Sequence, residues 1–263
     1  VNMIKNGSLA VFNLGCVSWN ATNHLQECIV NSRKKTPQFA TRSVDTSTSS
    51  LSNQNQNLPP HLQSILEIPG LATQDLLLFC EHPPIFTAGI RGKWTPEEQQ
   101  HLKDLGADTQ RSRRGGDITF HGPGQLMVYP IIDLTRFRKR AKCKGVRWFV
   151  HTLEETLIQT CAHYGITARR TEHTGVWVND NKIAAVGLRV AGGVTSHGVA
   201  LNCNTDLSWF NHIVPCGIEG KGVTSISREL TVSSELILPP KITPAAAQPV
   251  FTEIFDDLVS SGL

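Results

Sequence analysis

The chain has 263 residues, of which 40% are hydrophobic, and a formal net charge of +3 at pH 7. This composition predicts a globular protein with a full core, and it does not favour nucleic acid as a partner. The seven cysteines are an odd number without a C-x-x-C pair, which argues against a disulfide framework and a thiolate zinc site. No apolar run approaches the roughly 18 residues of a membrane-spanning helix, so no membrane span is expected.

The first half of the chain alternates predicted strands and helices. An apolar strand is expected at residues 9–14, and apolar side chains at helical spacing predict a helix over residues 21–29. Ser, Thr, Asn, Gln and Pro then dominate about residues 35–60, which predicts a flexible polar insertion on the surface. Order is expected to return with a buried strand at residues 75–80, followed by an extended piece at residues 85–88.

The middle of the chain carries two well-marked helices and a glycine-rich stretch. Thr95 and Glu98 have the spacing of a capping box, with a proline at the first helical position, so a helix should begin there. Residues 113–125 contain four glycines and lead into an apolar strand at residues 126–132. A second amphipathic helix is expected over residues 146–161.

Hairpins dominate the second half. Residues 175–178 and 182–190 predict a hairpin, with a further strand at residues 197–201. A short helix is expected at residues 224–230 and a last one over residues 244–255. This order favours an α+β fold, a mixed α/β sandwich, over a doubly wound parallel sheet. We expect a single domain spanning the whole chain, with the polar insertion as an appendage.

Two residues form a candidate reactive pair. Lys182 leads into the apolar run Ile-Ala-Ala-Val, where desolvation would lower the pKa of its amine and make the neutral form accessible. Cys216 lies between Pro215, which restricts φ, and Gly217, which permits unusual backbone angles. By themselves these residues leave a second interpretation open, namely a strand-edge lysine and an ordinary buried cysteine.

The glycine-rich stretch fits neither G-x-G-x-x-G nor the P-loop motif, so a dinucleotide or phosphate-loop site is not expected. Arg114 and His121 flank its turn, and as donors they are candidates for holding a carbonyl or carboxylate oxygen. His197 is a third candidate donor. For each of them a structural role in a turn or strand is the alternative. No histidine pair has a tight metal-ligand spacing, so no metal is expected.

Residues 114–126 read Arg-Gly-Gly-Asp-Ile-Thr-Phe-His-Gly-Pro-Gly-Gln-Leu, which resembles the signature of the lipoyl(octanoyl) transferases. Four further blocks match that family in the same order: Glu-His-Pro-Pro at 81–84, Lys-Ile-Ala-Ala at 182–185, Ser-His-Gly-Val-Ala-Leu-Asn at 196–202 and Pro-Cys-Gly at 215–217. Five matches in register, within about residues 75 to 230, argue against a chance resemblance.

The resemblance implies a fold similar to the catalytic domain of biotin and lipoate protein ligases. It implies transfer of an octanoyl group from octanoyl-acyl carrier protein to a lysine of lipoyl domains, in 2-oxoacid dehydrogenase complexes and in glycine cleavage H protein, without ATP or another cofactor. Cys216 would accept the acyl group, and Lys182 would lower its pKa and shuttle protons. The acyl pocket would be formed by Arg114, Gly115, Gly116, Asp117, Ile118, Thr119, Phe120, His121, Ala185, Val186, Gly187, Gly198, Val199 and Ala200.

Several alternatives stay open. An ATP-dependent lipoate or biotin ligase would also use a lysine like Lys182 but would activate a free acid, and Cys216 speaks against it. A non-catalytic module that binds acyl carrier or lipoyl domains would keep the fold without needing either residue. A cysteine hydrolase is disfavoured because no matching histidine signature is present.

The location is expected from resemblance alone. Mitochondrial members of the family have similar residues at 195–198 and 222–225 and a similar polar insertion. We therefore expect a mitochondrial location, with the cytoplasm as the alternative for a bacterial protein. Because the chain begins with Val1, loss of a targeting segment is left open.

Overall fold

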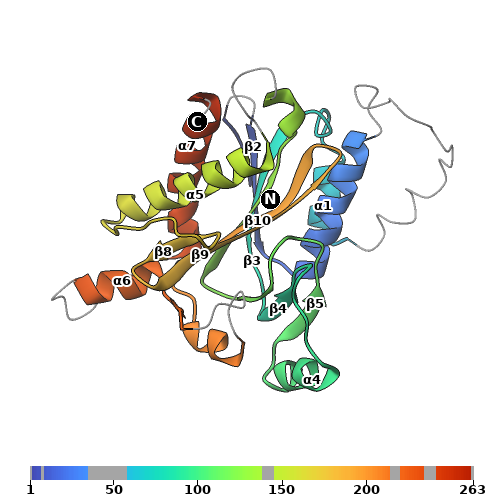
Figure 1. Ribbon diagram of the computed structural model, residues 1–263. Coiled ribbons are helices and arrows are strands. Elements are labelled where there is room, and N and C mark those ends of the chain that lie inside the picture. The colour runs from blue at the N-terminus through green and yellow to red at the C-terminus, as the bar shows by residue number, and fades with distance from the viewer. Residues whose placement is uncertain are drawn as a thin grey trace.

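The computed structural model describes residues 2–6, 9–34, 58–137, 145–213, 220–233 and 241–261. Within these residues, the larger of two sheets has eight strands in the order β1-β2-β3-β7-β10-β9-β11, with β8 paired to β9 (Figure 1). Its strands are β1 (Asn2–Asn6), β2 (Leu9–Cys16), β3 (Asp75–Glu81), β7 (Gln125–Ile131), β8 (Val176–Val178), β9 (Asn181–Ala191), β10 (Val194–Asn202) and β11 (Gly222–Val223). The β2–β3 and β9–β11 pairs are parallel, so the sheet is mixed.

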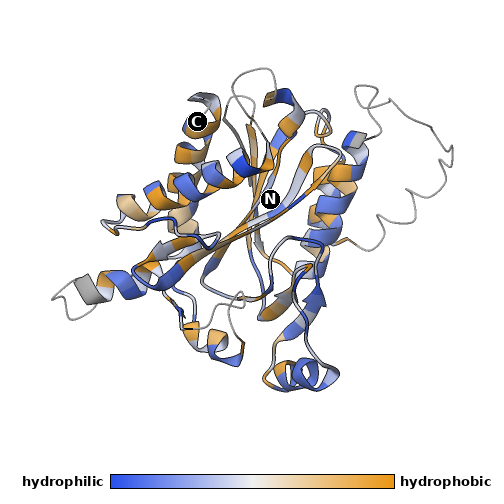
Figure 2. Cartoon of the chain, viewed as in Figure 1, coloured by the Kyte–Doolittle hydropathy of each residue, from blue (hydrophilic) through white to orange (hydrophobic). Residues whose placement is uncertain are grey.

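Helices cover both faces of this sheet because its central strands are apolar along their whole length. Successive side chains of a strand face opposite sides, so Leu77 and Phe79 of β3 enter one apolar cluster while Leu76 and Leu78 enter another. One face carries α1 (Trp19–Lys34) and α3 (Pro60–Leu66), and the other carries α5 (Val146–His163), α6 (Ile226–Ser233) and α7 (Pro244–Ser261). Hydrophobic residues concentrate on the strands and on the sheet-facing sides of these helices (Figure 2).

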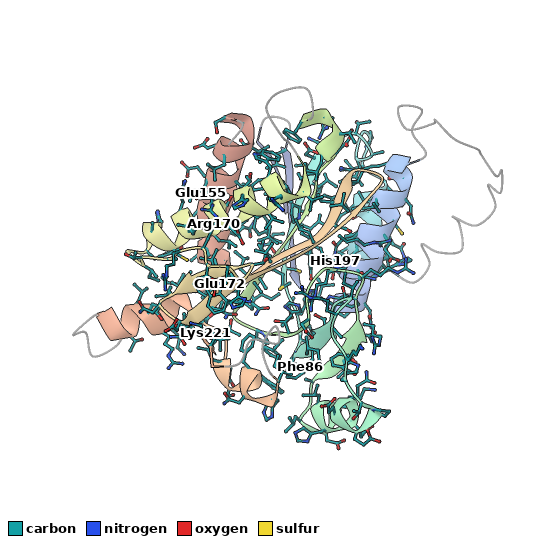
Figure 3. All side chains as sticks on the ribbon, viewed as in Figure 1. Phe86, Glu155, Arg170, Glu172, His197 and Lys221 are labelled. Carbon is teal, nitrogen blue, oxygen red and sulfur yellow. The ribbon has the colours of Figure 1, made fainter. Side chains whose placement is uncertain are left out.

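A smaller sheet lies beyond one end of the large one. It has the strand order β5-β4-β6, formed by β4 (Ile85–Ala88), β5 (Asp108–Arg111) and β6 (Ile118–His121). The connection from β4 to β5 is α4 (Pro96–Asp104), whose capping box is formed as predicted: Thr95 Oγ1 accepts from the Glu98 N–H, and the Glu98 carboxylate accepts from the Thr95 N–H. Phe86 of β4 lies in this lower part of the molecule (Figure 3), in an aromatic cluster with the 3₁₀ helix η4 (Leu207–His212).

The structure confirms the α+β class and most predicted elements, and it corrects others. The prediction that order returns only at residue 75 is wrong, because Leu58 is buried and α3 begins at Pro60. Strands β1 and β5 were not predicted, and β6 lies inside the stretch that was expected to be a turn. These three are short and polar or glycine-flanked, so their sequence pattern is weak.

Two groups of residues from the sequence analysis lie outside the described residues. These are 35–57, the bulk of the predicted insertion, and 214–219, which include Cys216. None of the helices within the described ranges is both long and apolar enough to cross a membrane.

Candidate active site

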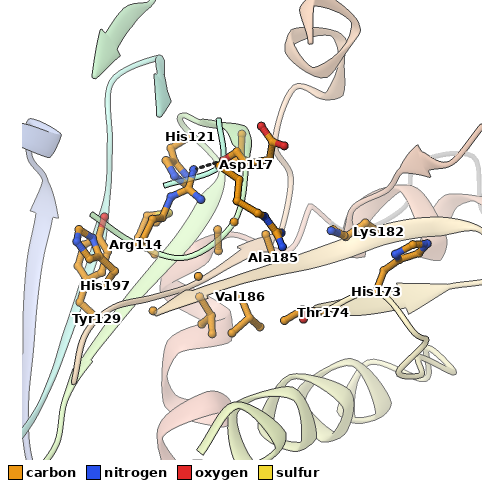
Figure 4. Close-up of a pocket in the computed structure, with 18 of the residues that line it drawn as sticks. Arg114, Asp117, His121, Tyr129, His173, Thr174, Lys182, Ala185, Val186 and His197 are labelled. Atoms are coloured by element: carbon orange, nitrogen blue, oxygen red, sulfur yellow. Dashed lines mark hydrogen bonds between the residues drawn. The ribbon is translucent and has the colours of Figure 1, made fainter. Parts of the chain in front are cut away.

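A cavity of about 210 Å³ lies between the two sheets, on the face of the large sheet that carries α1 (Figure 4). Strands β7, β9 and β10 form its floor, while β6 and the loop before it form the opposite wall. Its lining residues are Trp19, Arg91, Arg114, Gly116, Asp117, Thr119, His121, Met127, Tyr129, Glu172, His173, Thr174, Lys182, Ala185, Val186, Gly187, His197, Gly198, Val199 and Ala200. Lys182 and His173 lie at one end of the cavity, and His197 and Tyr129 lie at the other.

A β-bulge aims Lys182 into this cavity. Val176 pairs with Ala184, but the next residue of β8, Trp177, pairs with Lys182, so Ile183 is an extra residue in β9. An extra residue reverses the alternation of side chains along a strand. Lys182 therefore shares the cavity face with Ala185, three residues away, while Ile183 is buried in the core on the opposite face.

The side chain of Lys182 is enclosed, with 7% of the residue exposed. Its Nζ lies 4.8 Å from the centre of the Trp177 ring, so the amine contacts the face of the indole. The stem passes Gly175, where an added Cβ would lie 3.4 Å from the Lys182 Cε and 2.7 Å from the Ala184 carbonyl oxygen. Gly175 has a φ of +121°, and its N–H donates to the carboxylate of Glu154 on α5 (2.9 Å). These contacts hold the amine at its end of the cavity.

Small residues shape the floor where β9 and β10 run side by side. Ala185 pairs with Ala200, and Gly187 pairs with Gly198. A Cβ on Gly198 would lie 2.0 Å from the Val128 carbonyl oxygen, so only glycine fits there. Where these two strands meet, the floor carries small side chains only, which leaves room for an extended hydrocarbon chain.

Arg114 is buried, and its hydrogen bonds hold together the wall of the cavity that lies opposite the floor. Its Nη2 donates to the Thr87 carbonyl (2.7 Å), the Thr87 hydroxyl (2.9 Å) and the Asp117 carbonyl (2.9 Å), and its Nη1 donates to the Gly115 carbonyl (3.0 Å). The predicted donor thus holds the carbonyls of its own loop against β4. Its charge still faces the cavity, which it lines.

His121 belongs to a buried hydrogen-bond chain that crosses the site. The Thr87 hydroxyl donates to its Nε2 (3.2 Å), and its Nδ1–H donates to Gln125 Oε1 (2.8 Å). Gln125 Nε2 donates to Asn202 Oδ1 (2.9 Å), and Asn202 Nδ2 donates to the Thr224 carbonyl (2.9 Å). Because Gln125 donates onward to Asn202, its oxygen must face His121, and this fixes the proton of His121 on Nδ1.

Three histidines around the cavity are held neutral. Burial lowers the pKa of His121 to about 3, with the charge of Arg114 as the next cause. Burial and then Arg114 also lower the pKa of His197 to about 4. Burial lowers the pKa of His82 to about 4, although its bond to the Val17 carbonyl opposes this, and its other nitrogen accepts from the Tyr129 hydroxyl (2.6 Å).

The backbone and imidazole donors expected to hold an oxyanion are already engaged. The Leu188 carbonyl of β9 points away from β10 and accepts a hydrogen bond from the Gly115 N–H (2.9 Å). Since backbone groups alternate sides along a strand, Gly187 turns its own groups toward Gly198 on β10. Both nitrogens of His121 have partners as well. We expect the N–H groups around Gly187 and Gly198, with His121, to be candidates for holding a tetrahedral oxyanion, and this stays a prediction. In the structure the His121 nitrogens are bonded to Thr87 and Gln125, so His121 would have to exchange a partner to take that role.

Most, but not all, of the residues predicted for the pocket are brought together. Gly115, Ile118 and Phe120 do not line the cavity. Alternation along β6 lets only Thr119 and His121 face it, and it sends Phe120 into the aromatic cluster, where its ring stacks on Trp209 at a centroid distance of 5.2 Å.

Sequence reasoning left several lining residues unassigned to the pocket: Trp19, Arg91, Met127, Tyr129, Glu172, His173, Thr174 and His197. Period-2 alternation along the predicted strand at 126–132 could have indicated that Met127 and Tyr129 share a face. Trp19 lies far from the motifs in sequence, and residues 172–174, although they precede Lys182 by only eight to ten positions, match no motif.

Solved structures with a similar fold include lipoate protein ligases. A putative lipoate protein ligase from T. acidophilum has a TM-score of 0.59 at 12% identity, covering 95% of this chain and 84% of that one. Lipoate-protein ligase A bound with ATP has a TM-score of 0.53 at 16% identity, covering 71% of this chain and 73% of that one. At these identities the likeness establishes the fold: this is a lipoate protein ligase-type catalytic domain.

Sequence comparisons make the assignment narrower. Residues 62–253 match the model of the lipoyl protein ligase A/B catalytic domain. A mitochondrial octanoyl-[acyl-carrier-protein]:protein N-octanoyltransferase of Danio rerio is 50% identical over 209 residues, covering 79% of this chain and 87% of that protein. A relative of the same name from Homo sapiens is 47% identical over 181 residues (66% and 76%), and the octanoyltransferase of Rubrobacter xylanophilus is 48% identical over 161 residues (59% and 70%). The chain belongs to the lipoyl protein ligase A/B family and, within it, to the lipoyl(octanoyl) transferases.

Proposed function

We propose that this protein transfers an octanoyl group from octanoyl-acyl carrier protein to a lysine of a lipoyl domain, through an acyl-cysteine on Cys216. The relatives' names support the acyltransferase activity, a carrier-protein donor and a protein acceptor. The observation that carries the proposal is the position of Lys182, an enclosed amine at one end of a cavity and next to a stretch of floor built from Ala, Gly and Val residues.

In the first half of the reaction, Lys182 accepts the proton of the Cys216 thiol. A thiol with an ordinary pKa near 8.5 is mostly protonated at neutral pH, so a neighbouring base increases the thiolate fraction. The thiolate attacks the thioester carbonyl of the donor, and collapse of the tetrahedral intermediate expels the carrier thiolate. That thiolate takes the proton from Lys182 and leaves as a thiol, and the octanoyl group stays on Cys216 with its chain along the cavity floor.

In the second half, the acceptor lysine attacks the acyl-cysteine as a neutral amine. Its nitrogen forms the amide bond, the Cys216 sulfur leaves as a thiolate, and the proton lost by the amine returns to that sulfur by way of Lys182. Thioester exchange is nearly balanced in free energy and amide formation from a thioester is downhill. The reaction therefore needs no ATP.

Cys216 lies outside the described residues, so its role rests on the Pro-Cys-Gly motif. Both flanks of its segment are well anchored. On the N-terminal side, Trp209 of η4 stacks on Phe120. On the C-terminal side, Val223 of β11 pairs with Lys182, and the Thr224 N–H donates to the Lys182 carbonyl (3.0 Å). The chain that follows Cys216 thus returns directly beside the proposed base.

The proposal extends to acceptors and location. We assign the lipoyl domains of 2-oxoacid dehydrogenase complexes and glycine cleavage H protein as acceptors, and the mitochondrion as the compartment. Relatives from Danio rerio and Homo sapiens are named as mitochondrial, whereas the relative from Rubrobacter xylanophilus is named without a compartment. Octanoylation assays on each isolated acceptor test the first assignment, and fractionation of source cells with an antibody tests the second.

Intact-mass spectrometry of the purified protein tests the acyl-enzyme. Incubation with octanoyl-acyl carrier protein and no ATP should add one octanoyl group, which peptide mapping places on Cys216 and which Cys216→Ala lacks. A strict requirement for ATP would favour a ligase instead. Tight binding of the donor without any transfer would favour a non-catalytic binding module, and full transfer by Cys216→Ala would refute the cysteine mechanism.

A further inference from the structure

The end of the cavity remote from Lys182 is closed by two stacked rings. Trp19, the first residue of α1, stacks on His197 of β10 with ring centroids 6.3 Å apart and planes 16° apart. Both residues line the cavity. Figure 3 shows His197 beside α1, and Figure 4 shows it at the opposite end of the cavity from Lys182.

The wall behind this pair is rigid. His197 has a φ of +55°, a left-handed conformation that costs a non-glycine residue free energy and persists only where its surroundings impose it. Its N–H donates to Gln26 Oε1 on α1 (2.7 Å), which ties the strand to the helix. Tyr129, beside it, is held by the 2.6 Å bond to His82. Displacing this wall to enlarge the cavity would therefore cost a ligand binding free energy.

Trp19 faces the cavity rather than the hydrophobic core. Only 6% of it is exposed, yet it belongs to none of the three apolar clusters formed by the described residues. Its ring contact is with His197, which is itself a lining residue. Shortening the Trp19 side chain should therefore lengthen the cavity while leaving the core packing in place.

The length available matches a medium acyl chain. Ala185 lies near the Lys182 end, and Leu188 pairs with His197 at the far end. Three residues of extended strand separate them, roughly 10 Å. An extended eight-carbon chain spans roughly 9 Å, given C–C bonds of about 1.5 Å. A chain with its carbonyl near Lys182 thus places its terminal methyl group against the Trp19–His197 pair.

We propose that Trp19, backed by His197, is the end-stop that sets the upper limit of acyl-chain length. This inference rests on the proposed octanoyl transfer. Octanoyl fits in front of the indole, whereas each further methylene must either displace a rigid ring or leave the chain folded and partly exposed. A single methylene in a fitted apolar pocket changes kcat/KM about tenfold or more.

The test measures kcat/KM for transfer from acyl carrier protein loaded with C6, C8, C10, C12 or C14 chains to a lipoyl domain. In Trp19→Leu, the ratio of C12 to C8 should rise by about tenfold or more relative to the unmodified protein. Trp19→Phe keeps a ring on His197 but is smaller, so it should shift the profile in the same direction by less. It also serves as the second variant if Trp19→Leu does not fold.

The matched control is Trp148→Leu, a tryptophan packed against the core on the opposite face of the sheet and away from the cavity. It should lower stability without moving the chain-length profile. An unchanged C12 to C8 ratio in a folded Trp19 variant overturns the end-stop. Failure of the unmodified protein to transfer any chain overturns the proposed octanoyl transfer instead, so the two failures are distinguishable.

Discussion

Lys182 reaches the cavity through an irregularity in its strand. A regular strand would place Lys182 on the face opposite Ala185, because residues three apart point to opposite sides. The extra residue Ile183 reverses this, and the absence of a side chain on Gly175 leaves room for the lysine stem. The bulge within the motif Lys-Ile-Ala-Ala thus turns the proposed base, Lys182, toward the cavity. The residue types alone did not indicate this bulge.

Replacement of Lys182 tests its role as a proton carrier. Lys182→Arg places a guanidinium next to Trp177, and because a guanidinium stays protonated near neutral pH it can neither accept nor release the proton of the thiol. We expect the rate of acyl-enzyme formation to fall by about 100-fold or more, in line with the loss of general base catalysis, while the circular dichroism spectrum stays unchanged. Rapid-quench mass spectrometry measures this rate. Lys221→Arg, an exposed lysine paired with Asp180, is the control and should react normally. A normal rate in Lys182→Arg would contradict the proton-transfer role.

At the scale of the element, β10 lies between β7 and β9 and supplies much of the cavity floor. At Gly198 the backbone of β10 comes very close to β7, since an added Cβ would also lie 2.6 Å from the Pro130 Cδ. The strand could be predicted from its apolar pattern, but its start could not. It begins at Val194, three residues before the predicted start, because pairing with β9 continues to the Gly192-Gly193 turn.

Gly198→Ala should force β7 and β10 apart. We expect the free energy of unfolding to fall by about 3 kcal/mol, the upper range for overpacking in a rigid core. Gly115→Ala is the matched control, because its nearest neighbour to an added Cβ is the Leu188 carbonyl oxygen at 3.5 Å, an ordinary contact. It should change stability by less than about 0.5 kcal/mol. Urea denaturation of both variants decides the matter, and equal stabilities would show that the sheet relaxes around the methyl group.

At the scale of the whole molecule, three neutral histidines at the junction of the two sheets make the fold sensitive to acid. His82, His121 and His197 have folded-state pKa values of about 4, 3 and 4, below the ordinary value of 6.5. The unfolded chain therefore binds more protons than the folded one between about pH 6.5 and 4. Stability is fully present above pH 6.5 and is lost as the pH falls through this window.

Each of these histidines should lower the free energy of unfolding by about 1 kcal/mol per pH unit below pH 6.5. Urea unfolding at pH 7.0, 6.0 and 5.5 should show the loss, and His197→Asn should reduce its slope by about a third, since asparagine tolerates the same positive φ. His212→Asn is the control, because that side chain is exposed. A slope in His197→Asn equal to that of the unmodified protein would mean that His197 is not held neutral.

The sequence by itself determined the fold class, the capped helix at Thr95, the hairpin around Lys182 and the family, because these depend on local periodicity, caps and contiguous motifs. Only the tertiary structure decided which side chains face the cavity. Contiguous motif residues such as Thr119 and Phe120 point to opposite faces, and Trp19 reaches the same cavity from a distant segment. The physical reason is that a strand alternates its faces and a bulge resets that alternation, while the closure of the cavity depends on how α1 packs on β10.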